Sequence, residues 1–112
     1  MAKFGLLYLQ RGRWGGQQVV PEAWVRESLH KHVTFSPPRG PQTGYGYLWW
    51  ILSEPHAGHE EIRAALGFRG QHIFVIPSHH MVVVVTAGAR DPADMNRPSE
   101  FLYSDILPAI TR

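Results

Sequence analysis

The hydrophobic pattern changes from helical spacing near both ends of the chain to strand-like patterns in its centre. Apolar residues at helical spacing predict helices over residues 2–10, from Pro21 onward and over residues 98–110. Residues 30–43 contain three prolines and a glycine, which predicts a loop between the second helix and the central strands.

Three central segments have the composition of β-strands. Residues 45–52 are rich in aromatic side chains, residues 68–76 end at Pro77, and residues 81–87 form a nearly continuous β-branched run. The first two are expected to lie side by side, and residues 62–66 are either a short strand or part of a loop. The order of elements predicts one α+β domain over residues 1–112, with an antiparallel sheet of about three strands covered on one face by helices.

The segment over residues 81–87 has the composition of a buried strand, although a three-stranded meander would place it at an edge. Natural proteins rarely expose so apolar an edge, because its unpaired backbone groups can recruit another strand. The pattern therefore predicts a partner for this strand, either a second chain or sequence outside these 112 residues. One hypothesis for the function is accordingly a self-associating interaction module without catalysis, a homo-oligomer formed through the exposed sheet.

Composition excludes several other classes of function. Hydrophobic residues make up 44% of the chain and charged residues 18%, which is enough apolar surface for a packed core. The net charge is +2 and the basic residues are scattered, so the stripe of positive charge that binds nucleic acid is absent. The sequence has no cysteine for a disulfide or thiolate metal site, and no apolar run long enough to cross a bilayer. We therefore expect neither nucleic acid nor a membrane as a partner, and the sequence assigns no compartment.

An ordered set of segments resembles one known family. The segments are residues 3–9, 12–14, 20–25, 44–50, 67–77 and 82–88. In this order they resemble the C-terminal portion of the serine β-lactamase-like hydrolases, in particular the class C-related esterases and the 6-aminohexanoate-dimer hydrolase type. The resemblance implies the C-terminal part of the β-lactamase/penicillin-binding-protein-like fold. It also implies ester or amide hydrolysis of a small molecule through an acyl-enzyme, without a cofactor.

Family members use a Ser-x-x-Lys nucleophile, a Tyr-x-Asn type motif, and a third motif of Lys or His followed by x-Gly. Ala65-Leu66-Gly67 resembles the third motif. By this resemblance, Gly67 lets the backbone approach the substrate, and the Phe68 backbone N–H donates to the developing oxyanion. The resemblance also favours a position near the substrate for Gln71, although the residues alone indicate a hydrogen bond within the turn. Arg69 is either a contact for an anionic substrate group or a solvated arginine of the turn.

Aromatic residues of the preceding strand are further candidates for the substrate pocket. Strand alternation would place Tyr45, Tyr47 and Trp49 on one face. Core packing is the usual role of such residues, and the resemblance adds the interpretation that this face lines the acyl pocket.

The third motif departs from the family pattern at its first position. Ala65 stands where Lys or His is usual, and a cation there typically helps to hold a substrate carboxylate. Hydrolysis of esters or amides is therefore favoured over hydrolysis of β-lactams. A shift of about three residues in the alignment would move the motif to Ile62-Arg63-Ala64, and the sequence leaves both alternatives open.

The nucleophile and the second motif lie upstream of the matched region in relatives. Met1-Ala2-Lys3-Phe4 resembles an internal segment of relatives, so we expect a C-terminal fragment that is inactive in isolation. Ser28-Leu29-His30-Lys31 does spell Ser-x-x-Lys. However, Ser28 is predicted near the C-terminal end of a helix, whereas the family nucleophile lies at a helix N-terminus.

The seven histidines raise the alternative of a metal site. Only His56-x-x-His59-Glu60 has a suggestive spacing, and it falls in a predicted turn. The other histidines are expected in loops or, for His72, along a strand. We therefore predict no metal and no cofactor.

Overall fold

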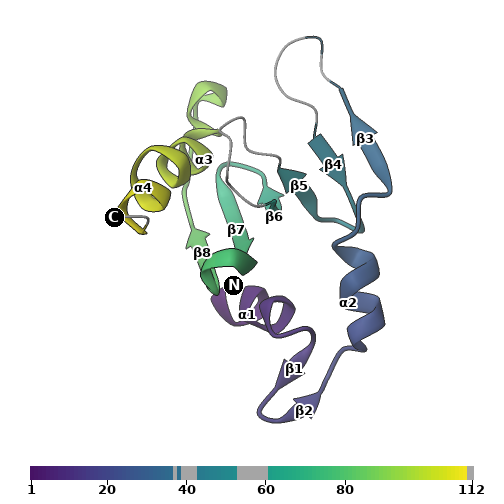
Figure 1. The fold of residues 1–112 in the computed structure, drawn as a ribbon. Coiled ribbons are helices and arrows are strands. Elements are labelled where there is room, and N and C mark those ends of the chain that lie inside the picture. The colour runs from purple at the N-terminus through teal and green to yellow at the C-terminus, as the bar shows by residue number, and fades with distance from the viewer. Residues whose placement is uncertain (37, 39–42, 53–60, 111–112) are drawn as a thin grey trace.

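Six antiparallel strands form the central sheet, in the order in which they follow one another along the chain, β3-β4-β5-β6-β7-β8. The computed structural model describes residues 1–36, 38, 43–52 and 61–110 (Figure 1). The strands of the sheet are β3 (Val33–Phe35), β4 (Thr43–Tyr45), β5 (Trp50–Leu52), β6 (Ile62–Gly67), β7 (Gln71–Ile76) and β8 (Met81–Val85). The remaining elements are α1 (Ala2–Leu9), β1 (Arg13–Trp14), β2 (Gln17–Gln18), α2 (Glu22–Ser28), two 3-10 helical turns (Pro77–His79 and Pro92–Asp94), α3 (Arg97–Phe101), a π-helical turn (Leu102–Ile106) and α4 (Leu107–Ile110).

The α+β class is confirmed, but the sheet has twice the expected number of strands. The segment over residues 45–52 was predicted as one strand and instead holds the end of β4, a turn and β5. Leu48 lies within that turn at φ 64°, a left-handed conformation that is incompatible with a strand. The open question over residues 62–66 is resolved, because they belong to β6. Since β6 pairs with both β5 and β7, the two segments expected side by side are separated by a strand.

Helices cover both faces of the sheet, whereas the sequence predicted one covered face. On one face, Phe74 of β7 and Ile62 of β6 pack against Leu102 and Leu107 of the C-terminal helical segment. On the other, Ile73 and Val75 of β7 pack with Trp49 and with the residues of α1. Coverage of both faces explains why β7 and β8 read as continuous apolar runs rather than alternating patterns.

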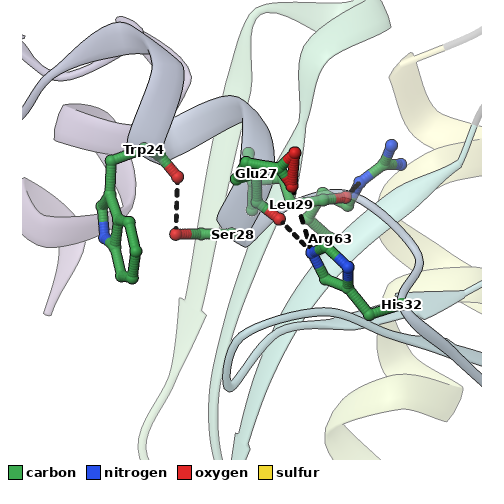
Figure 2. Close-up of polar contacts among 6 residues, drawn as sticks. All are labelled: Trp24, Glu27, Ser28, Leu29, His32 and Arg63. Carbon is green, nitrogen blue, oxygen red and sulfur yellow. Dashed lines mark hydrogen bonds and ion pairs between the residues drawn. The ribbon is translucent and has the colours of Figure 1, made fainter.

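The C-terminal end of α2 is fastened to the sheet by backbone and side-chain hydrogen bonds. The Tyr47 N–H donates to the Ser28 carbonyl at 2.9 Å, and Arg63 Nε donates to the Leu29 carbonyl at 3.0 Å (Figure 2). A Cβ atom at Gly46 would collide with the carbonyl oxygen of Ser28 and lie 2.7 Å from that of His30. Only glycine therefore lets the turn between β4 and β5 lie directly against the end of α2.

We predict that Gly46→Ala lowers the free energy of unfolding by about 2 kcal/mol or more, because the methyl group meets backbone atoms that cannot rotate away. Urea denaturation monitored by circular dichroism measures the change. Gly88→Ala is the matched control, since nothing lies within 4 Å of a Cβ placed there. Equal midpoints for the two variants would contradict the close approach.

Candidate functional site

A cavity of about 360 Å³ lies where the β6–β7 hairpin extends past the turn between β4 and β5. Met1 at the start of α1 lines one side of it. The other lining residues come from β4 to β7 and are Tyr45, Leu48, Trp50, Ala65, Leu66, Gly67, Gln71 and Ile73. The cavity therefore brings together three of the predicted site residues, Tyr45, Gly67 and Gln71, and we call it the hairpin cavity.

The hairpin tip places a free backbone donor beside this cavity. Gly67 ends β6 opposite Gln71, and a Cβ on Gly67 would lie 2.9 Å from the Gln71 carbonyl oxygen. Phe68 follows in the turn, not in the strand that was predicted to begin there. Its side chain is 74% exposed, and its backbone N–H has no hydrogen-bond partner among the described residues. An oxygen atom near the tip could accept a hydrogen bond from this N–H.

Arg69 and Gln71 have defined positions on either side of the tip. Arg69 adopts φ 64°, and its guanidinium lies 5.7 Å from the centre of the exposed Phe68 ring. The side-chain amide of Gln71 donates to the Ala87 carbonyl, which ties β7 to the segment after β8. Gln71 thus lines the cavity with its amide nitrogen engaged, while Arg69 covers Phe68 outside the cavity lining.

The prediction that Tyr45, Tyr47 and Trp49 share one face of a strand is wrong, because a turn interrupts that strand. Tyr47 lies outside the hairpin cavity. Its ring stacks on His32 and Trp24, with 4.4 Å and 5.4 Å between the ring centres. Trp49 is 3% exposed and packs against α1. Neither Tyr47 nor Trp49 lines the hairpin cavity, so the aromatic wall consists of Tyr45 and Trp50.

Trp50 and Leu48 are lining residues that the sequence analysis missed. Trp50 pairs with Tyr45 across the β4–β5 hairpin, with 4.6 Å between ring centres. Gly46 was the available signal, because a glycine within a short aromatic segment is typical of a tight turn. The left-handed conformation of Leu48 has no comparable signal, since leucine rarely adopts it.

Of the two candidate third motifs, Ala65-Leu66-Gly67 lines the hairpin cavity. Ile62-Arg63-Ala64 lies at the other end of β6, where Ile62 and Ala64 are buried in the core. Arg63 Nε donates there to the Leu29 carbonyl (Figure 2). The Arg63 guanidinium also forms an ion pair with the Glu61 carboxylate at 3.0 Å.

Ser28 lacks the geometry of a nucleophile. It is the last residue of α2, as expected, and it is 1% exposed. Its hydroxyl donates to the Trp24 carbonyl one turn earlier, at 2.7 Å (Figure 2). A buried hydroxyl in such a bond with its own helix has a structural role.

The metal alternative has no support in the described part of the chain. His56, His59 and Glu60 lie outside the described residues. Elsewhere in residues 1–36, 38, 43–52 and 61–110, no group of three histidine, aspartate or glutamate side chains is arranged to hold a metal ion. Within the same residues, every helix is too short or too polar to span a membrane.

His72 is a buried titratable residue close to the site. It neighbours Gln71 on β7 but points with Phe74 toward the C-terminal helices, with 5.5 Å between the two rings. Its Nδ1 atom has no hydrogen-bond partner in the described structure. Burial removes water from the imidazole and lowers the pKa of His72 from its ordinary value of 6.5. The neutral ring is therefore the form that the fold accommodates.

Comparison with known proteins identifies a structural neighbour. No family model and no curated protein matches the sequence. A solved structure from Bacillus anthracis, assigned as a 6-aminohexanoate-dimer hydrolase, matches with a TM-score of 0.72 and 26% identity. The match covers 98% of this chain but only 28% of the neighbour. The chain is thus similar to a region of a β-lactamase-like hydrolase, which supports a related hydrolase origin and the expected type of fold.

We predict that acid destabilises the protein partly through His72. In the unfolded chain the His72 imidazole binds a proton near pH 6.5. In the folded chain it binds the proton only at lower pH, because burial lowers its pKa. The contribution of His72 to stability is thus complete above pH 6.5 and is lost as pH falls from 6.5 to the lower folded pKa. Urea unfolding between about pH 7.5 and about pH 5 measures this loss. His72→Phe should show a shallower pH dependence, and identical slopes for both proteins would contradict it.

Proposed function

We propose that this chain forms part of the active-site wall of a β-lactamase-related serine hydrolase that cleaves a small-molecule ester or amide. The single observation that carries the proposal is the free Phe68 N–H, which directly follows Gly67 at the rim of the hairpin cavity. The similarity to a β-lactamase-like hydrolase supports the same assignment.

In acyl transfer, negative charge develops on the carbonyl oxygen as the nucleophile attacks. A backbone N–H held at a fixed position stabilises this charge without reorganisation, and one such donor contributes about 100-fold or more in rate. The Phe68 N–H would fill this role. Gly67 would leave space for the substrate, since it carries no side chain into the cavity that it lines.

The cavity lining favours an uncharged acyl group. Leu48, Trp50, Leu66 and Ile73 provide apolar surface, and Ala65 stands where a cation would hold a carboxylate. None of the lining side chains is charged. An ester or amide with an apolar acyl group therefore suits this surface better than a β-lactam, which carries a carboxylate beside its reactive ring.

The nucleophile of the proposed reaction is not among these 112 residues. The sequence contains one Ser-x-x-Lys, at Ser28, whose hydroxyl is buried and bonded to Trp24. The chain alone is therefore expected to be inactive, and the reaction requires the remainder of a complete hydrolase. The proposed acyl-enzyme chemistry uses no metal and no cofactor.

A chimera tests this proposal. This chain would replace the structurally equivalent segment of the Bacillus anthracis neighbour, and hydrolysis of p-nitrophenyl butyrate would be followed by absorbance. We expect the chimera to be active and the isolated chain to be inactive. Phe68→Pro removes the proposed donor and should lower kcat of the chimera about 100-fold or more. Phe68→Ala is the matched control, because it shortens the same side chain but keeps the N–H.

Three outcomes would contradict the proposal. A chimera that folds by circular dichroism but hydrolyses no ester would remove the hydrolase assignment. Equal rates for Phe68→Pro and Phe68→Ala would remove the oxyanion role of Phe68. Hydrolysis by the isolated chain that disappears with Ser28→Ala would place the nucleophile at Ser28 instead.

Self-association through β8 is a second candidate function, favoured by a specific observation. β8 pairs with β7 on one side and is the last strand of the sheet, so its other side has no strand partner among the described residues. Its five residues, Met81–Val85, are all apolar and uncharged. Such an edge lacks the charges and prolines that normally prevent strand addition. Antiparallel pairing of two β8 strands would join two sheets into one.

Sedimentation velocity tests the self-association. We expect a dimer that dissociates in Val85→Lys, because a charged side chain on an edge strand opposes the addition of another strand. Val33→Lys places the same charge on β3 at the opposite edge of the sheet and should leave the dimer intact. A protein that stays monomeric at high concentration would contradict the pairing.

A further inference from the structure

A second and larger cavity, of about 480 Å³, lies at the opposite end of α1 from the hairpin cavity. Met1 at the start of α1 lines the hairpin cavity, whereas Tyr8 and Leu9 at its end line the second one. Eight helical residues separate these ends by about 12 Å. No residue lines both cavities, so the second is a distinct site.

The inner surface of this second cavity is apolar. It is formed by side chains from α1, from the α2 segment and from the end of β7, namely Tyr8, Leu9, Val25, Leu29, Val75 and Pro77. Val25 and Val75 are almost completely buried, so packing holds this surface in place. Its volume lies in the range typical of small-molecule sites.

The rim carries an excess of positive charge. Arg11, Arg26 and Arg63 line the cavity together with His30, and Glu22 is the single carboxylate that lines it. An ion pair with Glu61 engages Arg63, and Arg11 lies 3.5 Å from Glu22. The Arg26 guanidinium makes no hydrogen bond or ion pair with any described residue. Arg26 is therefore available to an anion from outside the chain.

The rim is fixed in place by hydrogen bonds around Arg11. The Gln18 side-chain amide donates to the Arg11 carbonyl at 2.8 Å and to the Val20 carbonyl at 2.6 Å. Arg11 and Gly12 both adopt positive φ, at 56° and 86°, which turns the chain from α1 toward β1. These bonds hold the backbone at Arg11, while the Arg26 side chain that would meet an anion is exposed.

We propose that this second cavity binds a small amphiphile with a carboxylate head and an unbranched apolar chain. The chain would lie on the apolar inner surface, and the carboxylate would pair with Arg26, with Arg11 beside it. Guanidinium groups suit this contact because their planar donors match the two oxygens of a carboxylate. The inference stands apart from the proposed hydrolase function, since it uses none of the residues of the hairpin cavity.

Calorimetric titration of the full chain with octanoate tests the proposal. Octanol, which has the same chain without the charge, should bind about tenfold more weakly. Hexanoate should also bind more weakly, by about fourfold for each methylene group removed. Arg26→Gln should reduce the affinity for octanoate to near that for octanol. Arg90→Gln is the matched control, because it removes an exposed arginine that does not line the cavity.

Methyl NMR spectra locate the bound octanoate independently of affinity. Signals of Leu9, Val25 and Leu29 should shift on titration, while those of Leu48 and Leu66 in the hairpin cavity should not. Equal affinities for octanoate and octanol, or for Arg26→Gln and Arg90→Gln, would overturn the proposal. Shifts confined to the hairpin cavity, or no binding of octanoate, would overturn it as well.

Discussion

Burial of β7 between two layers of helices is the constraint on which the rest of the structure depends. Phe74, Val75 and Ile76 are 0 to 2% exposed, and neighbouring residues of this strand pack on opposite layers. β7 also makes the longest pairings in the sheet, with β6 and with β8. Its position therefore fixes the β6–β7 hairpin, and with it Gly67, Phe68 and the hairpin cavity. It also supplies Val75 to the second cavity at the other end of α1.

Much of the fold could be predicted because local pattern and tertiary packing agree in the helices and in β8. The apolar faces of residues 2–10 and 98–110 form helices, and the β-branched run at Met81–Val85 is a strand. The error in the number of strands arose where the two disagree. Residues 45–52 have the composition of a strand, but contact with the end of α2 fixes a turn at Gly46. Local propensity does not report this tertiary contact.

The same disagreement explains which site residues could be placed. Gly67 and Gln71 were placed near the substrate through the resemblance of a short segment to the third motif, and the structure brings both to the cavity. Tyr47 and Trp49 were assigned by alternation along a strand that does not continue. A turn there reverses the chain, so Trp50 takes the place beside Tyr45 that alternation gave to Trp49. The helical cover on both faces had a signal in the continuous apolar runs of β7 and β8, but the segments that supply this cover are determined by contacts between distant parts of the chain.

The two cavities differ in the charge that they present, although α1 contacts both. The hairpin cavity is lined by apolar and uncharged side chains beside the free Phe68 N–H, which suits a neutral carbonyl that becomes negative only during reaction. The second cavity has a permanent positive rim, which suits a ligand that is already anionic. Trp49 lies between them and packs against Phe4 and Tyr8 at 6.2 and 4.8 Å between ring centres. This packing fixes α1 on the sheet, and with it the positions of Met1 at the hairpin cavity and of Tyr8 and Leu9 at the second cavity.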